Sequence, residues 1–127
     1  MKNMHNKTLG NFGEDAAEKY LKENGYDIIA RNYRCRGGEV DIIVKKDDCL
    51  VFVEVKTRKN SEFGAPSEAV DFWKIQKIEM VANFYLSNRT KNPWIGDVRI
   101  DVIEVFGKLE LGRFYVENIN HIENVVN

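Results

Sequence analysis

Residues 49–57 form a run, CLVFVEVKT, that is apolar on both of its faces when it is extended. Alternate side chains of a strand point to opposite faces, and a strand that is apolar on both is normally central and covered on both sides. Two charged residues, Glu54 and Lys56, interrupt the run on one face near its end. Because burying ionisable side chains without partners is costly, the sequence predicts a central strand whose two charges need partners or a chemical role.

The surrounding sequence predicts one α/β domain over residues 1–127, with a central mixed sheet flanked by helices. Residues 12–24 have the apolar spacing of a helix that Gly25 ends, and Pro66 opens a second helix at 67–87. Patterns rich in β-branched and aromatic residues predict strands at 26–34, 39–45, 49–57, 97–106 and 109–119. We expect residues 1–9 to be a loose N-terminal segment and residues 121–127 a short tail.

Composition excludes several classes of protein. With 19 basic and 20 acidic residues, the chain lacks the bulk positive charge of a histone-like nucleic-acid binder, although a local basic face remains open. It has no run of about 20 apolar residues, which a membrane helix needs, and no apolar segment typical of a secretory signal. We therefore expect a cytoplasmic protein with no membrane partner, in which Cys35 and Cys49 are reduced thiols.

The predicted hairpin places two carboxylates opposite each other. A turn centred at residues 47–48 puts Asp41 directly across from Glu54, with Cβ atoms about 5 Å apart. Such a pair repels unless one group takes up a proton or a cation lies nearby, and Mg²⁺ is commonly held by one or two carboxylates with water and phosphate. Lys56, one pleat along, points at the same space, where it could orient water or stabilise charge on a phosphate. The three residues together suit hydrolysis of a phosphodiester.

Other charged residues lie near these elements. Glu14 borders the inner stripe of the first helix, where a carboxylate can point along the edge of the core. Glu39 flanks the site two residues before Asp41, and we expect it to have either a supporting role or a surface salt bridge. A basic rim for a nucleic-acid backbone would be formed by Arg31, Arg34, Arg36, Arg58 and Lys59, with Lys74 and Lys77 of the second helix as further candidates or as a solvated face.

The second helix also carries three aromatic residues, Trp73, Phe84 and Tyr85, at helical spacing. Such spacing is typical of the buried side of a helix. We therefore expect these residues to pack in the core rather than to form a platform for base stacking.

Three classes of function fit these residues. The first is a metal-dependent phosphodiester hydrolase, and the second is a catalytically silent nucleic-acid-binding or DNA-repair and recombination accessory module with the same fold. The third is a small interaction protein whose hairpin is merely structural. The intact set of Asp41, Glu54 and Lys56 favours the first, because a site that only binds phosphates gains nothing from paired carboxylates.

Several motifs resemble a known family. Asp41, followed on the next strand by Glu54-Val55-Lys56, is similar to the signature of the PD-(D/E)XK nuclease superfamily, although Val40 stands where that superfamily has its proline. From about Gly10 to Asn124 the chain more closely resembles the YraN-like family of uncharacterised predicted endonucleases. The motifs that carry this resemblance are Gly10 to Ala17, Gly38 to Asp41, Phe52 to Arg58 and Arg99 to Val102.

The resemblance implies a restriction endonuclease-like fold, with elements in the order αβββαβ plus a C-terminal strand. It implies that Asp41 and Glu54 hold Mg²⁺ or Mn²⁺, with the Val55 carbonyl as a further ligand. It also implies that Lys56 is the catalytic lysine and that Glu14 matches a helix glutamate of the archaeal-type Holliday junction resolvases. We therefore expect an endodeoxyribonuclease that recognises branched or structured DNA, for which Arg36, Arg58 and Lys74 would contact the nucleic acid. A homodimer would suit a branched substrate.

Overall fold

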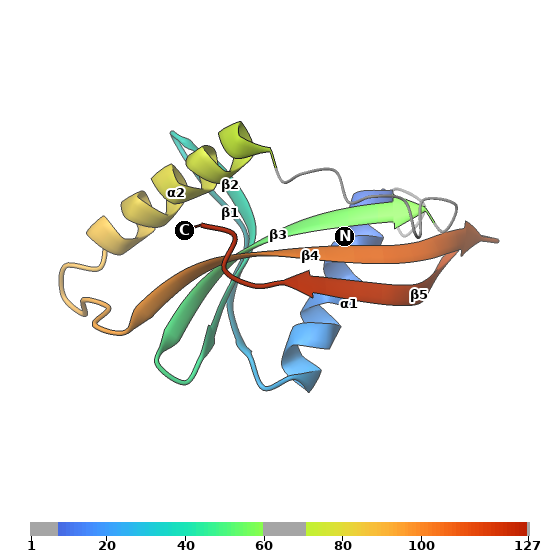
Figure 1. Cartoon of the computed structure of the whole chain (residues 1–127), viewed down its shortest axis with the longest axis horizontal. Helices are drawn as coiled ribbons and strands as arrows, with labels where there is room; N and C mark the ends of the chain where they lie inside the picture. The colour runs from blue at the N-terminus through green and yellow to red at the C-terminus, as the bar shows by residue number, and fades with distance from the viewer. Residues whose placement is uncertain (1–7, 60–70, 127) are drawn as a thin grey trace, which may run out of the picture.

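The computed structural model describes residues 8–59 and 71–126, which fold into two helices and five strands (Figure 1). In chain order the elements are α1 (Leu9–Glu23), β1 (Asp27–Cys35), β2 (Gly38–Lys46), β3 (Cys49–Lys59), α2 (Phe72–Ser87), β4 (Asp97–Glu110) and β5 (Arg113–Ile122). Most of the predicted N-terminal segment and the predicted start of the second helix, residues 67–70, lie outside the described residues. Within the described part of the chain, no helix is long and apolar enough to cross a membrane.

The strands form one mixed sheet in the order β1-β2-β3-β4-β5. Strand β3 pairs with β4 in parallel, whereas the other neighbouring pairs are antiparallel. The central place of β3 confirms the prediction from its two apolar faces. The α/β class and the mixed sheet flanked by helices are likewise as predicted.

The two helices cover opposite faces of the sheet, which lies between them (Figure 1). Helix α1 packs on a fully buried face whose members are Ile42, Val44, Val51, Val53, Ile103 and Val105. Helix α2 packs on the other face, whose buried members are Val40, Ile43, Leu50, Phe52 and Ile100. Glu54 continues the row of Leu50 and Phe52, so its side chain belongs to the face that α2 covers.

Helix α1 begins three residues before its predicted start. The side chain of Thr8 accepts a hydrogen bond from the Asn11 backbone N–H at 3.2 Å and so caps the helix. The glycines of the first turns lower the helix propensity there, which explains why the sequence pattern placed the start at residue 12. The predicted end is confirmed, because Gly25 has a φ of 86° just beyond the Asn24 cap.

The hairpin of β2 and β3 has the predicted register. Lys46 pairs with Cys49 across the turn, where Asp47 has a φ of 54°, and pairing continues to Ile42 and Val53. It stops there, one pair short of Asp41 and Glu54, whereas β3 continues alongside β4 as far as Lys59 and Gly107. Beyond this point β2 follows β1 away from β3, and the two parts of the sheet diverge beneath the N-terminal end of α2 (Figure 1).

Helix α2 only partly matches its predicted pattern. Ile78 and Val81 are buried, and Tyr85 packs against Phe52 with ring centroids 5.8 Å apart, as predicted. The prediction is wrong for Trp73 and Phe84, whose side chains are 71% and 46% exposed. Both residues lie outside the buried stripe of α2, which runs through residues 78, 81 and 82.

Both C-terminal strands end later than predicted, and the last one also begins later, at Arg113 instead of residue 109. Strand β4 continues through residue 110, because pairing with β5 persists up to the turn at Leu111 and Gly112, which have φ values of 50° and 75°. Strand β5 continues through Ile122, so His121 belongs to a strand and not to the predicted tail.

Candidate active site

Asp41 and Glu54 meet where β2 and β3 diverge. In place of a backbone pair between these residues, Asp41 Oδ2 accepts a hydrogen bond from the Val55 backbone N–H at 2.7 Å. The carboxyl groups of Asp41 and Glu54 also share a hydrogen bond. The register thus brings the two carboxylates together, as predicted. The contact is made by side chains and not by a backbone pair, because the Asp41 carboxylate accepts the Val55 N–H, which a neighbouring strand would otherwise bond.

Burial sets the ionisation of this pair. Glu54 is only 6% exposed, and its burial, followed by the charge of Asp41, raises its pKa to about 7. Burial raises the pKa of Asp41 as well, against the lowering effect of the Val55 N–H. The two carboxyl groups therefore tend to retain a proton between them near neutral pH, as expected for close carboxylates without a cation.

Two lysines lie beside the carboxyl pair. Lys74 of α2 places its Nζ 3.6 Å from Oε1 of Glu54, so the helix that was predicted to contact nucleic acid reaches the site itself. Lys56 lies one pleat beyond Glu54 on the same strand, and its charge, after that of Lys74, lowers the pKa of Glu54. Glu54 thus faces positive charge from two different elements, α2 and β3, and Asp41 faces the charge of Lys74.

Glu14 approaches from the opposite side, on α1. Gly13 lets the helix touch β3, because a Cβ at this position would overlap the side chain of Thr57. Burial, and then the charge of Asp41, raises the pKa of Glu14, which places this carboxylate within electrostatic reach of the pair. Arg31 forms an ion pair with this carboxylate, with its Nε 3.4 Å from Oε1 of Glu14.

The remaining predicted site residues are more dispersed. Arg58 lies on the same face of β3 but forms an ion pair at 3.1 Å with Glu104, which is 2% exposed. Arg36 is exposed in the turn between β1 and β2. Glu39 pairs at 2.7 Å with the exposed Arg34, which matches the surface salt bridge that was one of its two predicted roles.

Glu104 was not predicted from the sequence. This residue pairs in register with Lys56 on the neighbouring strand, and its Oε1 also accepts a hydrogen bond from Asn120 at 2.9 Å. Glu104 lies within the apolar run DVIEVF, and a charged residue within an apolar run is the same signal that singled out Glu54. This signal could therefore have identified Glu104 from the sequence.

A second buried network lies on the α1 side of the sheet. Asp101 is fully buried, and Arg99 donates two hydrogen bonds of 2.9 Å to its carboxylate. His121 Nε2 lies 2.7 Å from the same carboxylate, and His121 Nδ1 lies 2.9 Å from the hydroxyl of Tyr20. No sequence pattern indicated this network, because Tyr20 and His121 lie far from Arg99 and Asp101 in the chain.

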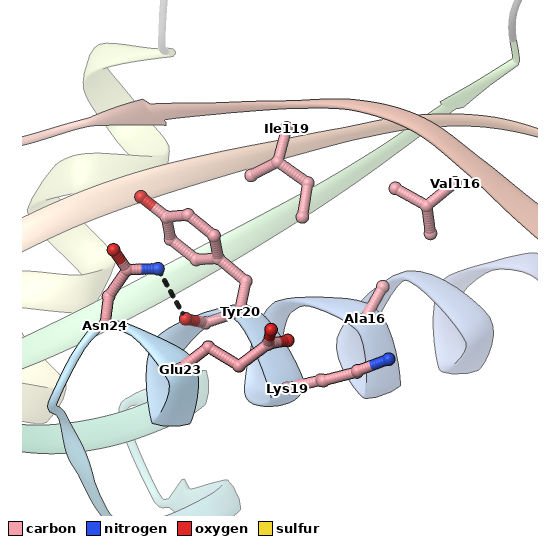
Figure 2. Close-up of a pocket in the computed structure, with 7 residues that line it drawn as sticks. All are labelled: Ala16, Lys19, Tyr20, Glu23, Asn24, Val116 and Ile119. Carbon is pink, nitrogen blue, oxygen red and sulfur yellow. Dashed lines mark hydrogen bonds between the residues drawn. The ribbon is translucent and has the colours of Figure 1, made fainter.

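A surface pocket of about 250 Å³ lies between α1 and β5 (Figure 2). Ala16, Val116 and Ile119 supply its apolar lining, and the ring of Tyr20 lies against β5 (Figure 2). The pocket lies on the α1 side of the sheet and Glu54 on the α2 side, so the pocket is separate from the carboxyl pair.

The donor atoms of the site suit a hard divalent cation. Among residues 8–59 and 71–126 there is no group of three or more His, Cys, Asp or Glu side chains placed to hold a metal ion. Mg²⁺ requires only one or two carboxylates, with water and substrate phosphate completing its coordination. The N–H and C=O of one strand residue point to the same side, so the Val55 carbonyl faces the side of Asp41 as well. The residues present therefore fit a cation held by two carboxylates.

Comparison with known proteins identifies close relatives. The model of the uncharacterised protein family UPF0102 matches residues 13–105. A UPF0102 protein of Caldanaerobacter subterraneus subsp. tengcongensis is 43% identical over 98% of each chain. Another, of Clostridium beijerinckii, is 47% identical over 94% of this chain and 93% of its own. A third, of Clostridioides difficile, is 44% identical over 95% of this chain and 98% of its own.

Proposed function

The chain belongs to the UPF0102 family, and we propose that it is a Mg²⁺- or Mn²⁺-dependent nuclease that hydrolyses phosphodiester bonds in DNA. The observation that carries this proposal is the contact between the carboxyl groups of Asp41 and Glu54 with lysines on two sides. We also assign the chain to the PD-(D/E)XK superfamily, with a restriction endonuclease-like fold. This assignment rests on the resemblance of its motifs and on the mixed sheet whose central strand carries Glu54 and Lys56.

Each residue has a separate task in this proposal. Asp41 and Glu54, with the Val55 carbonyl, would hold the cation, which when bound would offset the negative charge of the substrate phosphate and acidify water. Lys56 donates hydrogen bonds that orient the attacking water and stabilise the charge that develops on the phosphate oxygens. Lys74, now 3.6 Å from Glu54, is free to turn to a phosphate once a cation neutralises that carboxylate. Glu14 completes the acidic cluster from α1.

Cleavage of a labelled panel of DNA substrates tests this function. The panel contains duplex, single strand, flap and four-way junction, each with Mg²⁺ or Mn²⁺, and compares the wild type with Glu54→Gln purified in parallel. Glu110→Gln, an exposed carboxylate at the far end of β4, is the matched control. We expect cleavage by the wild type and the control only, with calorimetry showing that Glu54→Gln also loses Mn²⁺ binding. Metal binding without cleavage of any substrate would favour the accessory module instead.

Lys56→Ala tests the role of the lysine separately. We expect kcat to fall about 100-fold or more, the size typical of a lost acid–base or electrostatic contribution. Thermal unfolding should change little, because Lys56 is only half-buried. Lys108→Ala, on β4 and about half exposed, controls for loss of one positive charge. Full activity in Lys56→Ala would remove the assigned role.

A further inference from the structure

Helix α2 exposes an aromatic and basic stripe next to the candidate active site. We define the α2 stripe as Phe72, Trp73, Lys77, Met80 and Phe84. Its apolar members are exposed by 65% at Phe72, 71% at Trp73, 58% at Met80 and 46% at Phe84. Residues 73, 77, 80 and 84 recur at helical spacing, so they share one side of α2, outside the buried stripe and bordering the β1–β2 turn at Gly37.

The stripe begins one residue from the site. Lys74, whose ammonium group lies 3.6 Å from Glu54, directly follows Trp73 in the first turn of α2. Asp71 fixes that turn, because its carboxylate accepts the Trp73 backbone N–H at 3.0 Å. The rings of Phe72 and Trp73 meet edge to face, with centroids 6.1 Å apart. The two rings therefore lie in the same turn of α2 as Lys74, which contacts Glu54.

We infer that Phe72 and Trp73 stack against unpaired bases of a nucleic-acid strand whose backbone passes the Asp41–Glu54 pair. This inference rests on the proposed nuclease function and specifies its substrate as single-stranded DNA or the unpaired arm of a branched one. Base stacking on aromatic rings, combined with basic residues that follow the backbone, is how sequence-tolerant single-strand binding works. Lys77 supplies such a charge on the same side of the helix.

The composition of the stripe favours a nucleic-acid strand over a second copy of this chain. In a two-fold dimer the same patch meets itself, so Lys77 in the middle of the stripe would be brought close to its own symmetry mate and desolvated. Like charges at the centre of an interface are unfavourable. A nucleic-acid strand presents π-faces to the rings and phosphates to the lysine, and so matches both kinds of residue.

Tryptophan fluorescence reports directly on this stacking. The chain has two tryptophans, so a Trp94→Phe variant leaves Trp73 as the sole reporter. We expect a short oligothymidylate to quench its emission in saturable fashion with EDTA present, because stacking does not need the cation and cleavage does. The same length of blunt duplex should quench little, because its bases are already stacked on one another.

Binding measurements with matched variants supply the second test. Fluorescence anisotropy of labelled oligothymidylate should show affinity about tenfold or more weaker for Trp73→Ala, the usual effect of removing one stacking ring. Trp73→Phe should restore most of it, because a phenyl ring also stacks. Leu111→Ala, which removes a fully exposed apolar side chain at the β4–β5 turn, should bind as the wild type does. With metal, Trp73→Ala should raise KM for single strands more than it lowers kcat.

The outcomes separate this inference from the proposed function. Quenching of Trp73 emission in Trp94→Phe, with weaker binding by Trp73→Ala but without cleavage of any substrate, would support the stacking surface and overturn the nuclease. Cleavage that depends on Glu54, with unquenched Trp73 emission and unchanged single-strand affinity in Trp73→Ala, would overturn the stacking surface alone. A dimer in sedimentation that Trp73→Ala dissociates, again with unchanged single-strand affinity, would also overturn it.

Discussion

Glu54 shows how far one buried carboxyl group can depart from its ordinary chemistry. Its burial, and next the charge of Asp41, raises its pKa to about 7, although Lys74 and Lys56 act in the other direction. In the folded protein without metal, the group therefore holds a proton that the unfolded chain releases at lower pH. Keeping this carboxyl group buried therefore lowers stability as pH rises above 4.5, and the full loss is reached above about 7, where Glu54 is ionised in the fold.

This linkage gives a prediction for Glu54→Gln in the absence of divalent cations. Because the folded pKa is raised, the wild type loses stability as pH rises from its unfolded value of 4.5 through about 7. We expect Glu54→Gln to have a free energy of unfolding about 1–3 kcal/mol above that of the wild type near pH 8, since one pKa unit corresponds to about 1.4 kcal/mol. The difference should shrink as the pH falls below about 5.

Urea unfolding of both proteins across this pH range, with EDTA, measures the effect. Glu110→Gln, which changes an exposed carboxylate, should follow the wild type at every pH. A stability difference that stays constant with pH would contradict the linkage and show that Glu54 acts through packing alone.

At the scale of elements, the contact of α1 with β3 positions Glu14. A Cβ at residue 13 would overlap the Thr57 side chain, whereas one at residue 10 would meet only Thr8 Oγ1 at 3.8 Å. Both glycines lie in α1, where alanine is intrinsically preferred by about 1 kcal/mol. Only the packing against β3 distinguishes the two positions.

We therefore expect alanine to have opposite effects on stability at Gly13 and at Gly10. Gly13→Ala should lower the free energy of unfolding by about 1–3 kcal/mol, the usual cost of overpacking, and should reduce cleavage by moving Glu14 away from Asp41. Gly10→Ala should leave stability unchanged or raise it slightly. Chemical denaturation of the two variants beside the wild type decides the matter, and equal effects of both would show that the α1–β3 contact is looser than described.

The elements also show what sequence patterns can and cannot predict. The β2–β3 register followed from the turn and from strand alternation, because both are local, and it brought Asp41 to Glu54. The exposure of Trp73 could not be predicted in this way, since helical spacing defines a side of α2 but not which side the sheet covers. Arg99, Asp101 and His121 were unpredictable as a network because only the packing of β5 and α1 on β4 brings their partners together.

At the scale of the whole molecule, the fold divides its charged residues between the two faces of the sheet. The α2 face holds Glu54, Lys56 and Lys74 beside exposed rings, whereas the α1 face closes over Asp101 completely. Asp101 joins β4 to β5 through His121 and to the C-terminal segment through the Asn124 backbone N–H at 2.9 Å. Lys56 and Lys74 of the first group are partly exposed, whereas the hydrogen bonds of the second group hold three segments together.

The Asp101 network therefore has a structural role that Asp101→Asn isolates. Burial acts to raise the pKa of Asp101, but hydrogen bonds from His121, Arg99 and the Asn124 backbone outweigh it, and the pKa lies below its usual value. A lowered folded pKa contributes stability that is present above the unfolded value of 3.8 and is lost as pH falls through the folded one. We expect Asp101→Asn to lower the free energy of unfolding by about 3 kcal/mol at neutral pH, as for other broken buried ion pairs.

Thermal unfolding at neutral and acidic pH checks this prediction. Asp101→Asn should lose less stability than the wild type on acidification, because it lacks the group that must take up a proton. Glu117→Gln on β5 removes a carboxylate that is 36% exposed and lies 4.0 Å from Lys108, and it should change little. If Asp101→Asn instead abolished cleavage while unfolding as the wild type does, the Asp101 network would have to take part in the chemistry, and its structural role would be wrong.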